Sequence, residues 1–261
     1  MVNLNQKLIN KITCANCSDI FKDIENKSVD LILTDPPYNI LKEKVVEFEK
    51  DKTFISLEKE FFRILKPGGT LLTFASWQLW HEILNDWNKL KFWYELIIVR
   101  TNSYSAPYKR RPIHAHEYAL VFCNDRKKVY FNERELGEYK DPYSRGLHDH
   151  NSKAHVAKNE IKSSIHQNND GFRKPLSVLK MRSKNNFKKE ERTDHPTQKD
   201  VVLIEKLVKA YCPENGLVLD PFCGVGTTAI ACQNSNRNFI AIEIDKQWAD
   251  IAENFLIKKG L

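Results

Sequence analysis

Residues 217–228 of this 261-residue chain have the sequence Leu-Val-Leu-Asp-Pro-Phe-Cys-Gly-Val-Gly-Thr-Thr. Their apolar start predicts a short buried strand over 217–219, and the spacing that follows predicts a helix over 227–234. The glycines between them let the backbone turn tightly and approach a ligand. A second strand, over 239–242, then ends at Glu243. This order is typical of Rossmann-like folds that hold the ribose of a nucleoside cofactor, in which a strand is followed by a glycine turn, a helix and a second strand that ends in an acid. Because the turn lacks a third glycine, a plain tight turn is the alternative.

The same alternation of strands and helices continues on both sides of this stretch. Apolar runs predict strands over 29–33, 70–74, 92–99 and 118–122, and helical spacing predicts helices over 54–65, 77–87, 201–211 and 247–257. Lys-Pro-Gly-Gly at 66–69 should end the first of these helices. The pattern predicts an α/β fold with a twisted, mostly parallel sheet flanked by helices.

A second motif, Thr34-Asp35-Pro36-Pro37-Tyr38-Asn39, follows directly after the strand predicted over 29–33. Consecutive prolines cannot continue a central strand, so the chain opens into a loop there. In an open α/β sheet, ligands bind beyond the carboxyl ends of the strands. Asp35 and the Pro36 carbonyl offer two acceptors for the two N–H bonds of an aromatic amine, and Tyr38 offers a flat surface for its ring. Taken alone, the motif also fits an ordinary strand-ending turn.

Residues 126–192 lose the alternating pattern and are strongly basic. They contain 17 Lys/Arg and 9 Asp/Glu, a net charge of +8, whereas the whole chain carries +7, so the remainder sums to about −1. An isolated basic stretch of this kind is usually a solvated, flexible surface insertion.

Composition narrows the class of protein. Hydrophobic residues make up 41% of the chain, enough for a substantial core. No apolar run is long enough to cross a bilayer, and the polar N-terminus has no signal-peptide pattern. Six cysteines without such a signal predict reduced thiols in a cytoplasm. Cys14 and Cys17 form a C-x-x-C, but no second pair with ligand spacing follows, so we expect no metal site.

In combination, the motifs resemble the permuted, or beta-class, amino-methyltransferases of DNA. In that family an Asp-Pro-Pro-Tyr catalytic loop comes first, a target-recognition segment follows, and a Phe-x-Gly-x-Gly cofactor loop comes last, as in this chain. His195-Pro196-Thr197-Gln198-Lys199 and His116-Glu117-Tyr118 match two further family segments. The resemblance covers residues 11–124 and 193–257. It implies a Rossmann-like S-adenosylmethionine-dependent methyltransferase fold with a catalytic half at 1–125, a basic target-recognition insertion at 126–192 and a cofactor-binding half at 193–261.

The resemblance also implies where S-adenosylmethionine binds. Glu243 would accept hydrogen bonds from the ribose hydroxyls, and Asp220 or the Thr197-Gln198 pair would hold the amino-acid end. The family's usual Gly-Asp contact to the cofactor's adenine is replaced here by Asn16-Cys17, with Asp19 as a substitute. The full set of residues assigned to the cofactor is Asn16, Cys17, Asp19, Asp35, Thr197, Gln198, Lys199, Asp220, Pro221, Phe222, Gly224, Gly226, Thr227, Thr228 and Glu243.

DNA is the partner that the resemblance implies, with the target base flipped out of the duplex. The catalytic loop would be Asp35, Pro36, Pro37 and Tyr38, with Tyr38 stacking on the base. Given the family, the basic segment is better interpreted as phosphate contacts and base readers. The residues assigned to DNA are Lys109, Arg110, Arg111, Arg173, Lys174, Arg182 and Lys184.

N6 of adenine is the expected target, because N4-cytosine enzymes more often have serine in place of Asp35. Methylation at N4 of cytosine needs the same grip on an amine and is the alternative within the family. From another class, a DNA-binding protein could keep this fold without catalysis, although intact Asp35, Tyr38, Gly224 and Gly226 speak against it. The family implies a prokaryotic or viral enzyme in the cytoplasm. A cognate restriction endonuclease and a second copy of the chain are partners that the sequence leaves open.

Overall fold

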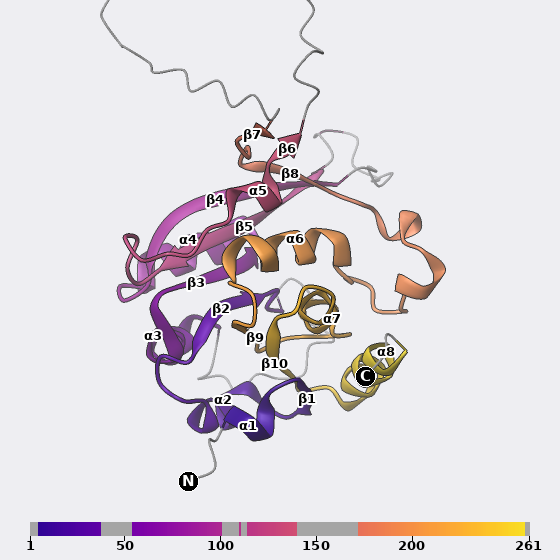
Figure 1. Ribbon diagram of the computed structural model, residues 1–261, viewed down its shortest axis with the longest axis horizontal. Helices are drawn as coiled ribbons and strands as arrows, with labels where there is room; N and C mark the ends of the chain where they lie inside the picture. The colour runs from indigo at the N-terminus through magenta and orange to yellow at the C-terminus, as the bar shows by residue number, and fades with distance from the viewer. Residues whose placement is uncertain (1–4, 38–53, 101–109, 111–113, 140–171, 259–261) are drawn as a thin grey trace, which may run out of the picture.

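The computed structural model describes residues 5–37, 54–100, 110, 114–139 and 172–258. Within these ranges the main sheet has the strand order β1-β10-β9-β2-β3-β5-β4-β8 (Figure 1). The strands are β1 (Lys11–Cys14), β2 (Val29–Thr34), β3 (Leu65–Ala75), β4 (Lys91–Arg100), β5 (His116–Cys123), β8 (Val178–Met181), β9 (Leu217–Asp220) and β10 (Asn238–Glu243). Only β5 pairs antiparallel with its neighbours, so the predicted mostly parallel sheet is confirmed.

Helices cover both faces of the sheet (Figure 1). One face packs against α6 (Val201–Tyr211), α7 (Thr227–Asn234) and α8 (Lys246–Ile257). The other packs against α2 (Cys17–Ile20), α3 (Glu58–Ile64) and α4 (Trp77–Asp86). Alternation along the strands explains the two cores, because Leu31 and Leu33 point into the first and Ile32 into the second. Burial of both faces accounts for the near-continuous apolar runs in the sequence.

The region between β2 and β3 differs from the prediction in detail. The helix expected over 54–65 begins as a 3₁₀ turn, η2 (Phe54–Leu57), and ends at Ile64. Residues 66–69 belong to β3, although the pairing of β2 with β3 is irregular there. Gly68 has φ +87°, and a Cβ at this position would come within 2.3 Å of the Lys128 carbonyl oxygen. The glycine thus serves close backbone packing inside an irregular strand.

The basic segment contributes structure that the pattern did not predict. Its strand β8 pairs in parallel with β4 at the end of the main sheet. A short helix, α5 (Glu133–Leu136), packs on α6, and Asn132 N donates to Ala210 O at 2.8 Å. A separate pair, β6 (Glu138–Tyr139) with β7 (Phe172–Arg173), lies next to it (Figure 1). The division into 1–125, 126–192 and 193–261 stays a prediction, but the described ends of the middle segment are attached to the main sheet and its helices.

The short N-terminal helix α1 (Asn5–Leu8) and the 3₁₀ turns η1 (Phe21–Asp23), η3 (Lys184–Asn186) and η4 (Lys189–Glu191) complete the described elements. All six cysteines are free thiols. In the ranges given above, no helix has the length and apolar character needed to cross a membrane.

Candidate active site

The two motifs that decide the sequence analysis meet at one edge of the sheet. β2 and β9 are parallel neighbours, with Leu31 opposite Val218 and Ile32 opposite Leu219. Their carboxyl ends therefore lie side by side, and the loops that follow them start from the same place. Thr34 Oγ1 donates a hydrogen bond to Asp220 Oδ1 at 3.1 Å, across 186 residues of sequence. This bond fixes the Asp35-Pro36-Pro37 loop next to the glycine turn.

The glycine turn has the backbone that only glycine adopts readily. Gly224 and Gly226 have φ of +51° and +77°, and Gly226 is the residue that begins α7. A Cβ on Gly226 would lie 3.0 Å from the Cβ of Ala252 in α8. Among the described residues, a Cβ on Gly224 would meet the His195 ring alone, at 3.6 Å.

Glu243, at the end of β10, supports this turn. Its Oε2 accepts a hydrogen bond from Gly224 N at 2.8 Å, and its Oε1 accepts one from Asp245 N at 2.9 Å. Burial raises the pKa of the Glu243 carboxyl. Ala15 N donates to the Glu243 carbonyl at 2.9 Å, so the end of β1 lies beside the end of β10. The residues after β1 therefore follow next along the same edge.

Those residues are the three that were expected near the cofactor's adenine. Asn16 begins α2, where its Oδ1 accepts from Ser18 N at 3.0 Å. Cys17 is buried, and burial raises its pKa to about 11, so it is a core thiol. Asp19, in the first turn of the same short helix, is exposed.

Asp220 is buried and its acceptors are used within the protein. It accepts hydrogen bonds from Thr34 Oγ1, from Phe222 N at 3.1 Å and from the Thr228 hydroxyl. Burial is the main reason that its pKa rises to about 7. The arrangement braces the turn and gives Asp220 a structural role. Pro221, Thr227 and Thr228 are likewise buried, and the half-buried Phe222 ring packs against Phe54 at 6.1 Å.

Residues 193–199 contact both motifs, because His195 lies next to Gly224 and Lys199 lies next to Asp35. The ring of His195 packs on Trp248 at a centroid distance of 4.6 Å. Burial lowers the pKa of His195, while the nearby Asp35 carboxylate opposes that shift. Gln198 is buried, accepts from Thr193 N at 2.9 Å and donates to Glu191 O at 2.7 Å. Its amide therefore shapes its own loop, whereas Thr197 is exposed.

Lys199 connects this segment to the Asp35-Pro36-Pro37 loop. Its Nζ lies 2.8 Å from Asp35 Oδ2 and 2.9 Å from Glu117 Oε2. The sequence motifs include all three residues, but nothing in the sequence indicated that they touch. Pro36 is buried and Pro37 exposed, and Tyr38 lies outside the described residues.

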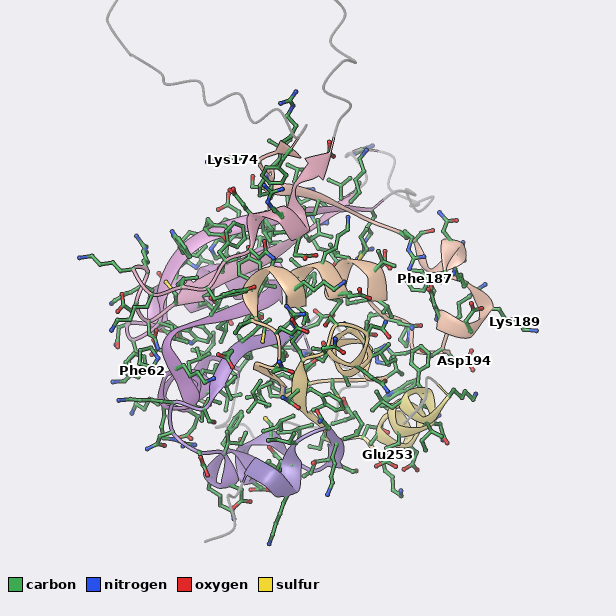
Figure 2. The ribbon with its side chains drawn as sticks, in the orientation of Figure 1. Phe62, Lys174, Phe187, Lys189, Asp194 and Glu253 are labelled. Atoms are coloured by element: carbon green, nitrogen blue, oxygen red, sulfur yellow. The ribbon has the colours of Figure 1, made fainter. Side chains whose placement is uncertain are left out.

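The residues assigned to DNA differ in their exposure to solvent. Arg110 and Lys174 are exposed and Arg173 is half-buried. Lys174 lies beside β6 and β7 at one end of the molecule (Figure 2). Lys109 and Arg111 fall outside the described residues.

Arg182 and Lys184 differ from the other residues assigned to DNA, because the structure gives both of them partners within the protein. The Arg182 guanidinium lies 2.6 Å from Asp200 Oδ1 and 3.1 Å from Glu191 Oε2. Lys184 Nζ donates to the His195 carbonyl at 2.9 Å. These donors hold the segment before α6 in place, which argues against their use as phosphate contacts.

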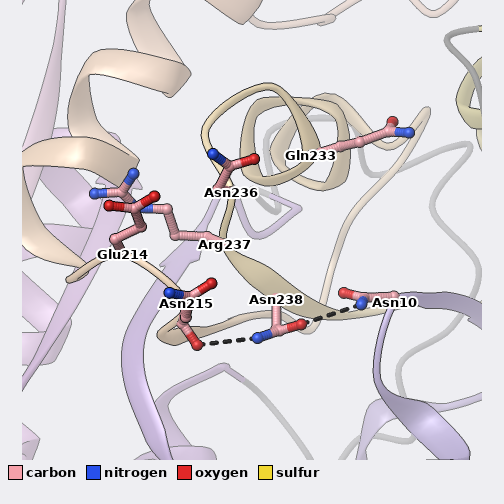
Figure 3. A pocket seen from close by; sticks show the side chains of 7 residues that line it. All are labelled: Asn10, Glu214, Asn215, Gln233, Asn236, Arg237 and Asn238. Atoms are coloured by element: carbon pink, nitrogen blue, oxygen red, sulfur yellow. Dashed lines mark hydrogen bonds between the residues drawn. The ribbon is translucent and has the colours of Figure 1, made fainter.

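A cavity of about 320 Å³ lies at the opposite, amino-terminal edge of the sheet (Figure 3). It is lined by Asn10, Glu214, Asn215, Gln233, Asn236, Arg237 and Asn238. Asn238 donates to Asn215 O at 2.9 Å and accepts from Asn10 Nδ2 at 3.1 Å, as Figure 3 shows. None of the motif residues lines this cavity.

Comparison with known proteins shows the family to which the chain belongs. A family model described as DNA methylase, of the N6/N4 type, matches residues 29–254. The chain is 30% identical to the DNA adenine methyltransferase YhdJ of Escherichia coli (strain K12), over 87% of this chain and 76% of that protein.

Two solved structures are similar to the chain. One is the M1.HpyAVI–SAM complex, with 26% identity and a TM-score of 0.66, covering 94% of this chain and 98% of that one. The other is the cytosine-N4-specific PvuII DNA methyltransferase, with a TM-score of 0.67, covering 96% of this chain and 87% of that one. Its identity is 13%, which shows a shared fold alone. Since the family model spans most of the sequence, the chain belongs to the N6/N4 family of DNA methylases.

Proposed function

We propose that this DNA methylase transfers a methyl group from S-adenosylmethionine to N6 of adenine. The hydrogen bond from Thr34 to Asp220 supports the proposal most directly, because it joins the residue before Asp35 to the residue before the glycine turn. Asp35 favours adenine, since the cytosine enzymes more often have serine there. YhdJ, a relative at 30% identity, is a DNA adenine methyltransferase. Methylation at N4 of cytosine is the competing assignment, because the same two acceptors would hold that amine.

S-adenosylmethionine is the methyl donor of this family, and the residues at the carboxyl edge fit it. The strand order β1-β10-β9-β2 arranges the loop ends in sequence along that edge. Asn16 and Asp19 would face the adenine, Glu243 the ribose hydroxyls and the glycine turn the methionine part. Among the described residues, the His195 ring alone lies within 4 Å of a Cβ built on Gly224, which supports a close approach of a ligand to this backbone. Because Asp220 and Gln198 are bonded internally, Thr197 and the backbone of the turn remain for the amino-acid end.

Asp35 and Pro36 would act by positioning the target amine. An amino group on a base is a poor nucleophile because its lone pair is delocalised into the ring. Two acceptors drawing on its two N–H bonds favour tetrahedral nitrogen, which localises that lone pair. S-adenosylmethionine, when bound, would supply an electrophilic methyl group, and the amine nitrogen would gain that methyl group as its bond to sulfur breaks and a neutral thioether is left. The amine's extra proton departs to water after transfer, so Asp35 need not be a strong base.

The target base must leave the duplex to reach this edge. We assign its stacking partner to Tyr38 and the neighbouring backbone contacts to Lys109, Arg110 and Arg111. Arg173 and Lys174 extend the basic surface at the β6–β7 end. Phosphate contacts of this kind position DNA without reading its sequence.

The test is methyl transfer from labelled S-adenosylmethionine to unmodified DNA, followed by digestion to nucleosides. We expect label in N6-methyladenine with the wild-type protein and a loss of at least about 10²-fold in rate for Asp35→Asn. Asp250→Asn, an exposed carboxylate on α8, is the matched control and should keep the wild-type rate.

Label in N4-methylcytosine would keep the reaction and overturn the choice of base. No label in DNA despite measurable cofactor binding would favour a DNA-binding protein without catalysis.

A further inference from the structure

Lys199 lies between two carboxylates from different parts of the sheet. Asp35 follows β2 and Glu117 belongs to β5, and their oxygens lie 2.8 and 2.9 Å from Nζ. The ammonium also lies 4.7 Å from the centre of the Phe74 ring, on β3. The side chains of Lys199, Asp35 and Glu117 are only 12%, 21% and 16% exposed. At this degree of burial, charge–charge attraction is stronger than on an open surface.

These contacts occupy the surroundings of the Lys199 ammonium. A lysine has three N–H donors and no acceptor. Two carboxylates and the face of an aromatic ring surround this one, and a cation over such a face is attracted to it. Binding the cofactor or a phosphate would require Lys199 to give up one of these contacts. The arrangement therefore disfavours the cofactor role that the family resemblance implied for this residue.

Glu117 is itself held from the other side. The guanidinium of Arg100, at the end of β4, binds Glu117 Oε1, which directs Oε2 toward Lys199. The register of β4 with β5 brings Val99 opposite His116, and Arg100 N donates to Ala115 O at 2.9 Å. Positive and negative groups thus alternate from Arg100 through Glu117 and Lys199 to Asp35. Removing one member would leave a neighbouring charge poorly compensated.

We infer that Lys199 is a positioning residue for methyl transfer, whose ammonium holds the Asp35 carboxylate in the orientation that accepts the target amine. The inference rests on the proposed function. Glu117 and Arg100 hold the ammonium in turn. Lys199 also belongs to the segment whose His195 packs on Trp248 and faces the glycine turn. One short segment therefore contacts both the amine-binding loop and the cofactor side, and fixes one relative to the other.

The first test separates the rate from cofactor binding. Lys199→Met removes the charge at similar length, Lys199→Arg keeps the charge, and Lys206→Met, on the exposed side of α6, is the matched control. We expect Lys199→Met to lower kcat by about 10²-fold, the size of effect that a misplacement of about 1 Å can have. The Kd for S-adenosylmethionine, measured by calorimetry, should stay within about twofold. Lys199→Arg should recover part of kcat, and Lys206→Met should behave as wild type.

A raised Kd for S-adenosylmethionine with unchanged kcat at saturation would overturn the inference and return Lys199 to the cofactor. If Lys199→Met fails to fold, Glu117→Gln decides, because wild-type kcat in this variant would equally overturn the inference. A double-mutant cycle of Lys199→Met with Asp35→Asn, followed by urea unfolding, needs no activity. The two effects should be non-additive, and additive effects would show that the pair is not coupled. An inactive wild type with coupled residues would count against the proposed function and not against this contact.

Discussion

Gly224 and Gly226 are a matched pair for testing which interactions determine the conformation of the glycine turn. Both have the left-handed backbone that costs a side chain about 1–2 kcal/mol. We expect Gly224→Ala to lower the free energy of unfolding by about that amount. Gly226→Ala should cost more, because its Cβ would lie 3.0 Å from the Ala252 Cβ and force α7 away from α8. Urea unfolding measures both values, and a larger decrease for Gly224→Ala would contradict this account.

Asp220 should make stability depend on pH. Its ordinary pKa of 3.8 is raised to about 7 by burial in the folded protein. Between these values the folded state keeps a proton that the unfolded state has released, so this group's contribution to stability falls as the pH rises from about 4 to 7. Asp220→Asn keeps an acceptor for Thr34 and Phe222 and cannot ionise. The variant should therefore gain stability relative to wild type over this range, on the order of 3 kcal/mol.

The measurement for Asp220→Asn is urea unfolding at pH 4.5 and 7.5, with the exposed Asp250→Asn as control. An Asp220→Asn variant whose stability parallels that of wild type at both pH values would show that the carboxyl is ionised when folded.

The contribution of His195 to stability should change with pH in the opposite direction. Because the pKa of His195 is lowered in the folded protein, the unfolded state binds more protons. Its contribution to stability therefore rises with pH up to about 6.5.

At the scale of elements, α6 and α8 each have an aspartate as their N-cap, and the two aspartates differ in one respect. Asp200 accepts from Val202 N and also binds Arg182, whereas Asp245 accepts from Gln247 N and Trp248 N without an arginine partner among the described contacts. We expect Asp245→Ala to cost about 1 kcal/mol of stability, as for other helix caps. Asp200→Ala should cost about 2–3 kcal/mol, since it also removes the nearer of the two carboxylates that bind Arg182. Arg182 is 31% exposed, which limits the effect. Equal decreases in urea unfolding would show that the arginine contributes nothing.

The elements that the sequence predicted well are those with two buried faces or a clear helical stripe. The bounds of α6 and α7 agree with the prediction at both ends. β1 and β8 were missed because each has four residues and only one of them is buried, Ile12 and Met181 respectively. A run of four residues is too short for its hydrophobic period to be distinguished from chance. The 3₁₀ start of the helix at Phe54 was missed for a similar reason, since apolar spacing over so few residues fits both helix types.

At the scale of the whole molecule, the sequence predicted that the two motifs lie at one edge of the sheet, but it did not predict the contacts between their residues. Each motif follows a strand, and the strand-end rule brings Asp35 and Gly224 to one edge. Which donors those groups would receive depends on residues from other parts of the chain. Thr34 finds Asp220, Lys199 finds Asp35 and Glu117, and Gln198 turns inward to its own loop. Such pairings depend on the tertiary path, which motif spacing in one sequence does not determine.

The distribution of charge leads to a prediction for DNA binding by the whole molecule. Residues 126–192 carry a net charge of +8, while the rest of the chain sums to about −1. Within this segment Arg182 and Lys184 are bonded inside the protein, whereas Lys174 is exposed and Arg173 half-buried beside β6. Removing a side chain that binds one DNA phosphate should reduce the slope of log K against log salt by about 0.9.

We therefore expect the double substitution Arg173→Gln, Lys174→Gln to flatten that slope by up to about 2. The pair Lys246→Gln, Lys258→Gln removes the same charge from α8 and its end, and should leave the slope unchanged if DNA binds the basic segment. Arg182→Gln should lower stability and change the slope little, because its guanidinium holds Asp200. Fluorescence anisotropy of a labelled duplex over a potassium chloride series measures all three. Equal flattening by both lysine-containing pairs would mean that DNA responds to the net charge of the protein and not to this segment.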